Sequence, residues 1–162
     1  MDDTEITGLD EWIRRATERE AGPGTGQAAM AGWREQITAI MTAHPELCDF
    51  GFGVYDQHAK TRGQIADELA RERAAMLEPR SIGQFGAAQR WLGEFKKLSR
   101  PNKRGTSYGL KHVAAPSIGY CTNGMFIAAA VAAGFSLKRV GANAYFNISS
   151  EAWDPARARH AE

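Results

Sequence analysis

Cysteine is scarce in this sequence, which has only Cys48 and Cys121 among 162 residues. Two thiols cannot form the disulfide framework of a small secreted protein, so we expect both to be buried and free. Long hydrophobic runs are scarce too. The longest, Met125 to Phe135, is shorter than the roughly 20 apolar residues that cross a bilayer. The first residues, MDDTEITGLDEW, contain no secretory signal. These absences predict a cytoplasmic protein that does not associate with membranes.

Acidic residues are almost absent from one part of the chain. Residues 80–150 contain one acid, Glu94, against ten lysines and arginines, whereas residues 1–79 contain 15 acids against eight lysines and arginines. The overall charge of +1 conceals this division. Such an asymmetry indicates that the basic part faces a polyanion. The alternative is that the acidic part packs against the basic part and neutralises it.

Motifs for catalysis are also missing. The glycine-rich segment 21–27 has no preceding strand and no lysine where a phosphate-binding loop requires one. Two distant cysteines and scattered histidines do not supply the four ligands of a zinc site. His112 and Cys121 could form a thiol–imidazole pair, which needs a third group such as Asn123 or Asn143 to orient it. Because isolated Cys and His residues are more often structural, we expect no enzymatic activity, no metal and no cofactor.

A helical pattern with a small β component is what the sequence does contain. The run from Met125 to Phe135 has no charged or hydrogen-bonding side chain, as is typical of a helix buried on all sides. Thr122 or Asn123 can cap its start, and Gly134 can end it. The pattern predicts five other helices, over 9–20, 27–43, 61–77, 81–98 and 106–115. It also predicts a hairpin of strands 136–139 and 143–148, and a strand over 50–55 that can join it.

Length and pattern together predict one domain over residues 1–150. It has an acidic helical part over 1–79 and a basic helix–helix–hairpin part over 80–150, and a polar tail follows over 151–162. The expected fold class is mainly α with a small β-hairpin (α+β).

The order of elements over residues 81–149 is helix, basic loop, helix, turn, buried helix and hairpin. This order is similar to that of a winged helix-turn-helix DNA-binding domain. The resemblance implies DNA binding, with the hairpin as the wing. The central helix, however, offers no long polar side chain that could read base edges in a groove. Base contacts would have to come from Asn123, or from Lys111 and His112 in the preceding helix.

We therefore expect binding that depends mainly on phosphate contacts, which position a protein without carrying sequence information. The candidate residues are the basic side chains near the predicted loop and wing, one tyrosine that can stack on a base, and one asparagine. They are Lys96, Lys97, Arg100, Lys103, Arg104, Tyr108, Lys111, Asn123, Lys138 and Arg139. The expected partner is nucleic acid, duplex DNA in the first instance, in a regulatory role. The alternative is an interaction module or small inhibitor that occupies the surface of an unidentified protein partner, without catalysis.

Overall fold

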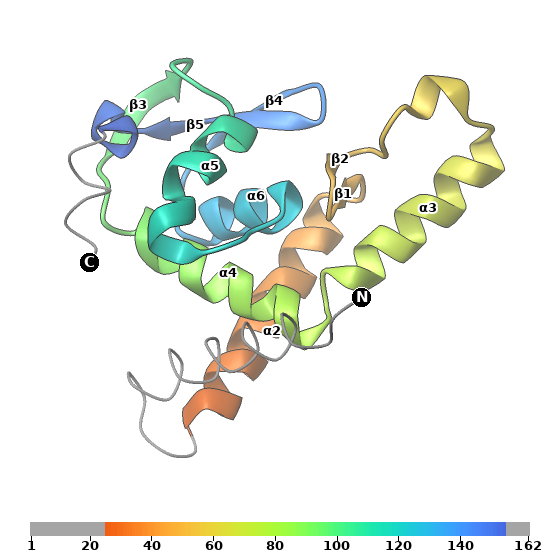
Figure 1. Cartoon of the computed structure of the whole chain (residues 1–162), viewed down its shortest axis with the longest axis horizontal. Helices are drawn as coiled ribbons and strands as arrows, with labels where there is room; N and C mark the ends of the chain where they lie inside the picture. The colour runs from red at the N-terminus through yellow and green to blue at the C-terminus, as the bar shows by residue number, and fades with distance from the viewer. Residues whose placement is uncertain (1–24, 155–162) are drawn as a thin grey trace.

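Helix α6 (Asn123–Ala132) lies at the centre of the fold (Figure 1). The computed structural model describes residues 25–154. From Asn123 to Ala130 every residue of α6 is buried, as expected for a helix that is apolar all round. Three helices pack against it: α2 (Thr25–Ala43), α4 (Pro79–Leu92) and α5 (Ser107–Ile118). The predicted buried helix is confirmed.

The two ends of α6 follow the predicted chemistry. The hydroxyl of Thr122 accepts a hydrogen bond from the backbone N–H of Met125 at 3.2 Å and so caps the helix. Gly134 ends it with a φ of +89°, a conformation that a glycine adopts without strain. None of the described helices has both the length and the apolar content needed to cross a membrane.

A three-stranded antiparallel sheet covers one side of α6. Its strands are β3 (Lys97–Asn102), β4 (Leu137–Val140) and β5 (Asn143–Ile148), in the order β3-β5-β4. Ala144, Phe146 and Ile148 of β5 are buried in the core, whereas Tyr145 is only half-buried. The predicted hairpin is therefore confirmed, with Gly141 in the turn at a φ of +59°.

Strand β3 corrects two sequence-based predictions. The predicted helix over 81–98 ends at Leu92, and the segment expected to be a loop begins with a strand. Its pairing partner explains the difference. The Asn147 side chain donates to the carbonyl of Leu98 at 2.8 Å, and the Asn102 side chain donates to the carbonyl of Ile148 at 3.0 Å. Pairing with β5 therefore determines the strand, and local propensity does not.

A second, two-stranded hairpin replaces the single strand predicted over 50–55. It consists of β1 (Leu47–Cys48) and β2 (Gly51–Phe52). Its link to the predicted C-terminal hairpin is a hydrogen bond from the N–H of Phe52 to the carbonyl of Ala142 at 2.9 Å. The glycines of this segment have φ values of +137° at Gly51 and +77° at Gly53, which interrupt a continuous strand.

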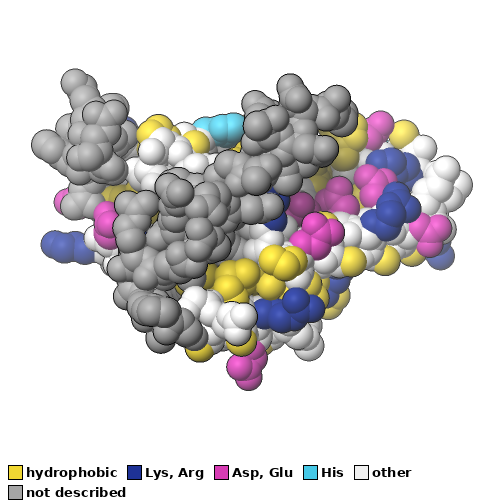
Figure 2. Space-filling model, turned by 60° about the horizontal axis from the view of Figure 1, so that its bottom comes forward, with side chains coloured by type: hydrophobic (Ala, Val, Ile, Leu, Met, Phe, Trp, Pro, Cys, Tyr) yellow, Lys and Arg dark blue, Asp and Glu magenta, His cyan; other side chains and the backbone are white. Residues whose placement is uncertain are grey.

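Helix α3 (Arg62–Ala75) extends away from the core at the right of Figure 1 and contains no buried residue. Thr61 begins it with a capping box that Gln64 completes. Near its end, the guanidinium of Arg73 donates to the carbonyls of Met41, His44 and Leu47, which ties α3 to the end of α2. Lysine or arginine and acidic side chains alternate over this end of the molecule (Figure 2).

Two short 3-10 helices complete the described chain, Gln57–Ala59 and Ser150–Trp153. Trp153 packs against the core and holds the start of the polar tail there. The predicted helix over 9–20 and the tail after Asp154 lie outside the described residues.

Candidate nucleic-acid interface

The acid-free part of the chain forms the sheet, α5 and α6. Residues 95–150 contain no aspartate or glutamate and eight lysines and arginines. Because α6 carries no charge, these cations lie on the other two elements of this segment, the sheet and α5. They therefore divide into a set on and around the sheet and one residue, Lys111, on α5.

Five of the eight cations have exposed side chains that make no hydrogen bond, ion pair or cation–π contact within residues 25–154. We call them the open cations: Lys96, Arg100, Lys103, Arg104 and Lys138. Four of them lie on β3 or beside it, and Lys138 lies on β4. The charge of an exposed cation without a carboxylate partner is not offset by a neighbouring group, so it can attract an external anion. The open cations are therefore the part of the predicted site that is available to phosphate.

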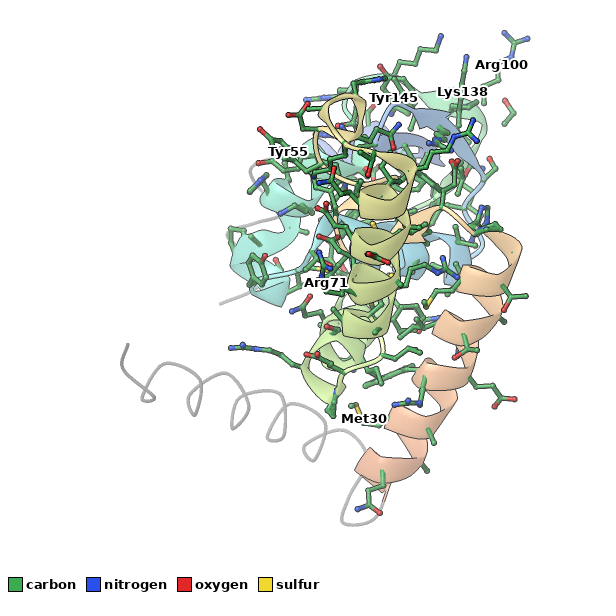
Figure 3. The ribbon with its side chains drawn as sticks, turned by 90° about the vertical axis from the view of Figure 1, so that its right-hand side faces the viewer. Met30, Tyr55, Arg71, Arg100, Lys138 and Tyr145 are labelled. Atoms are coloured by element: carbon green, nitrogen blue, oxygen red, sulfur yellow. The ribbon has the colours of Figure 1, made fainter. Side chains whose placement is uncertain are left out.

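The outer face of the sheet brings open cations from two separate strands together. Lys138 pairs in register with Tyr145 of β5. Figure 3 shows Arg100, Lys138 and Tyr145 at the top of the molecule, on the side of the sheet away from α6. Lys138 and Tyr145 follow Arg100 by 38 and 45 positions in the sequence. The strand order β3-β5-β4 places all three on one face. The sequence predicted both cations as contacts but not Tyr145. Tyr145 lies between the buried Ala144 and Phe146 and therefore faces the other side of β5.

Two predicted site residues at the sheet are already engaged by the protein. Arg139 forms an ion pair with Glu46, and its guanidinium carbon lies 5.0 Å from the centroid of the Phe52 ring. The Nζ of Lys97 lies 5.0 Å from the centroid of the Phe135 ring. The ion pair of Arg139 ties the basic part to the acidic part of the chain. Arg139 and Lys97 are therefore less available to a ligand than the open cations.

Helix α5 and the turn after it carry a group that we call the tyrosine cluster: Tyr108, Lys111, His112 and Tyr120. The side chains of Tyr108 and Tyr120 are 54% and 65% exposed. The Nζ of Lys111 lies 5.1 Å from the centroid of the first ring and 5.7 Å from the centroid of the second. The His112 ring meets the Tyr108 ring edge-on, with centroids 4.7 Å apart. The sequence predicted Tyr108 and Lys111 as contacts but gave no signal for Tyr120, which lies in the turn between two helices.

Asn123 does not lie on this surface, contrary to its prediction as a nucleic-acid contact. It is 6% exposed, and its side-chain amide donates to the carbonyl of Phe50 at 3.1 Å and to Oδ1 of Asn143 at 2.9 Å. The β1–β2 segment covers the start of α6, where the N–H of Gly124 donates to the carbonyl of Asp49 at 3.0 Å. The cap end of α6 is therefore used for internal packing.

The alternative thiol–imidazole pair finds no chemical support. Cys121 is 3% exposed, and its thiol donates to the carbonyl of Thr122 at 3.4 Å. Burial raises the pKa of the Cys121 thiol to about 12, even though the charge of Lys111 opposes the shift. A nucleophilic cysteine needs a thiolate, which this environment disfavours. The Cys48 thiol is also buried, and burial raises its pKa to about 12.

Metal and family comparisons add no further assignment. Within residues 25–154, no three His, Cys, Asp or Glu side chains form a group that could hold a metal ion. No family model matches the sequence, and searches of curated proteins and of solved structures gave no match.

Proposed function

We propose that this protein binds nucleic acid, duplex DNA included, mainly by contacting phosphates with the open cations. The observation that carries the proposal is the outer face of the three-stranded sheet, where Arg100 and Lys138 extend from different strands (Figure 3). No acid occurs in the sequence from residue 95 to residue 150 to offset them. Lysine and arginine that neutralise phosphates release counterions from nucleic acid, and this release supplies most of the free energy of sequence-independent binding.

The arrangement of elements supports the resemblance to winged helix-turn-helix domains. Helices α4, α5 and α6 are followed by the hairpin of β4 and β5, and β3, between α4 and α5, pairs with β5. In this protein α6 would not act as a groove-reading helix, because it is buried and has no basic side chain. The proposed contacts therefore lie on the sheet and on α5, and they position the protein without reading bases.

A fluorescence-polarisation titration tests the proposal. The full-length protein is titrated against random duplex DNA and random single-stranded DNA at salt concentrations from about 50 to about 200 mM, where phosphate-driven binding changes by orders of magnitude. We expect binding to both probes that weakens steeply as salt rises. If neither probe binds at the lowest salt concentration, the proposal is wrong, and the alternative of a protein partner takes its place.

A further inference from the structure

The tyrosine cluster combines features that the proposed phosphate contacts do not use. Two aromatic rings from different segments, one in α5 and one in the turn before α6, both contact the same ammonium group. The distances of 5.1 Å and 5.7 Å from the Nζ of Lys111 place the two ring centroids at most 10.8 Å apart. Both tyrosines are more than half exposed. Scattered exposed aromatics are common on protein surfaces, but a pair that faces one shared point is a specific arrangement.

The upper limit on the separation of the two rings leaves room for a planar ring between the tyrosines. An aromatic ring stacked between two others needs their centroids about 7 Å apart, which is twice the roughly 3.5 Å of close carbon–carbon contact. Both side chains are exposed, so rotation about χ1 and χ2 can adjust their spacing to a ligand. The ammonium of Lys111, displaced from the space between the rings, would remain within a side-chain length of it and could pair with a phosphate.

The charge of the cluster identifies the kind of ligand. Electron-rich ring faces also attract ammonium ligands, but such a ligand would have to approach Lys111, which has the same charge. No acidic residue belongs to the cluster to offset that repulsion. Asp49 is the acid whose charge acts on the adjacent Cys121, and its carboxylate already accepts a hydrogen bond from Thr122 at 2.7 Å. A ligand with a π face and a negative charge fits both the rings and the lysine, and a nucleotide has both.

We propose that the tyrosine cluster stacks an unpaired base between Tyr108 and Tyr120 and that Lys111 pairs with the adjacent phosphate. This inference rests on the proposed function and specifies its ligand as single-stranded nucleic acid. In a duplex, each base already stacks on its neighbours and presents only its edges, so the ring faces of the cluster would have no partner. The open cations would hold the backbone on either side of the stacked base, as in other proteins that bind single strands.

The experiment compares two probes that differ only in their bases. One is an oligothymidine of about 12 nucleotides, a length within the site sizes of single-strand binding domains. The other is an abasic strand with the same number of phosphates. Stacking on aromatic side chains predicts that the wild-type protein binds the thymidine strand about 5- to 150-fold more tightly than the abasic strand. The double variant Y108L/Y120L should lose this preference and retain its affinity for the abasic strand.

Two controls separate stacking from other effects. Y108F/Y120F keeps both rings and should keep the preference for bases. Y55L removes another exposed tyrosine, 67% exposed, which also lies beside a lysine. That lysine, Lys60, is paired with Glu68 at 2.8 Å, so Y55L should leave the affinity for both probes unchanged.

The outcomes distinguish this inference from the proposed function. Salt-dependent binding of equal strength to both probes would overturn the stacking inference and leave the proposed function intact. Failure to bind either probe would overturn the stacking inference, and failure to bind the random duplex as well would overturn the proposed function. If Y108L/Y120L retains the preference for bases, or weakens binding to both probes equally, the stacking site is not the tyrosine cluster. Binding of a methylated lysine peptide that Lys111→Ala strengthens would identify the cluster as a cation site and would also refute the inference.

Discussion

Replacing Arg100 and Lys138 together by alanine tests the sheet face directly. Both side chains are exposed open cations, and they extend from different strands of the same sheet. Their removal deletes two charges without opening a cavity or breaking a buried hydrogen bond. Surface substitutions of this kind change the free energy of unfolding by no more than about 0.5 kcal/mol. Any change in nucleic-acid affinity therefore reports the loss of phosphate contacts, because the fold is preserved.

The expected effect follows from the number of open cations. If all five contact phosphates of a duplex, the logarithm of the binding constant falls with the logarithm of salt concentration with a slope of about −4.5. This slope corresponds to an affinity loss of about 500-fold between roughly 50 and 200 mM salt. With two contacts removed, the slope becomes about −2.7, and the loss over the same range falls to about 40-fold. This difference between the two affinity losses is large enough for a polarisation titration to resolve.

The matched control removes the same charge from a different surface. R62A/R71A deletes two exposed arginines from α3, where basic and acidic side chains are mixed (Figure 2). It lowers the net charge of the protein by the same amount and should leave the salt slope unchanged. Equal slopes for R100A/K138A and the wild type would refute the assignment of the sheet face. Equal reductions in both double variants would show that net charge, and not the sheet face, determines binding.

Four further predictions concern the fold. A Cβ on Gly124 would lie 1.7 Å from the carbonyl oxygen of Cys48, so G124A should destabilise the protein by at least the roughly 1–3 kcal/mol that is typical of overpacking. A Cβ on Gly109 would meet nothing within 4 Å, so G109A should stabilise α5 by about 0.5–1 kcal/mol in urea denaturation. Burial, together with two neighbouring glutamates, raises the pKa of Asp49. The folded state therefore favours the protonated form, and stability is lost as pH rises from the ordinary pKa through the raised one. D49N should be more stable than the wild type at pH 7, with the difference shrinking in acid; a constant difference would contradict this cause. The thiols of Cys48 and Cys121, whose pKa values burial raises to about 12, should react with a thiol reagent at pH 8 only as fast as the protein unfolds.

Local signals made the central helix and the hairpin predictable. An apolar run of eleven residues, a threonine before it and a glycine near its end identify α6, because burial, capping and termination each depend on residues within the run or beside it. The alternation in β5 is equally local, since it records which side of one strand faces the core. Neither inference needed to know which element packs against which.

The candidate site was less predictable, because it depends on pairing between distant segments. Strand β3 contains two cations, Lys97 and Arg100, and Pro101, and three more cations lie just outside it. This pattern is typical of a loop. The segment becomes a strand because β5 offers it an unpaired edge, 46 residues away in the contact between Asn102 and Ile148. The same pairing places Arg100 on a face with Lys138. The sequence could therefore identify the cations but could not show which of them share a surface.

The burial of α6 also limits where this protein can recognise a ligand. A helix that supplies the core on all sides has no face left for a groove, so recognition must come from the elements that cover it. Part of that cover belongs to the acidic part of the chain: α2, β1 and β2. The sheet and α5 are the part of the cover that belongs to the acid-free segment, and they lie together at the upper left of Figure 1, away from α3. Among residues 96–139 of the described chain, Arg139 is the cation paired with a carboxylate of the acidic part. Within residues 25–154, the acidic part contacts the acid-free segment mainly through the uncharged helix α6. The charge asymmetry of this part of the chain is thus retained as an asymmetry in space. A polyanion that approached the sheet and α5 would therefore meet open cations before it met the described residues of the acidic part.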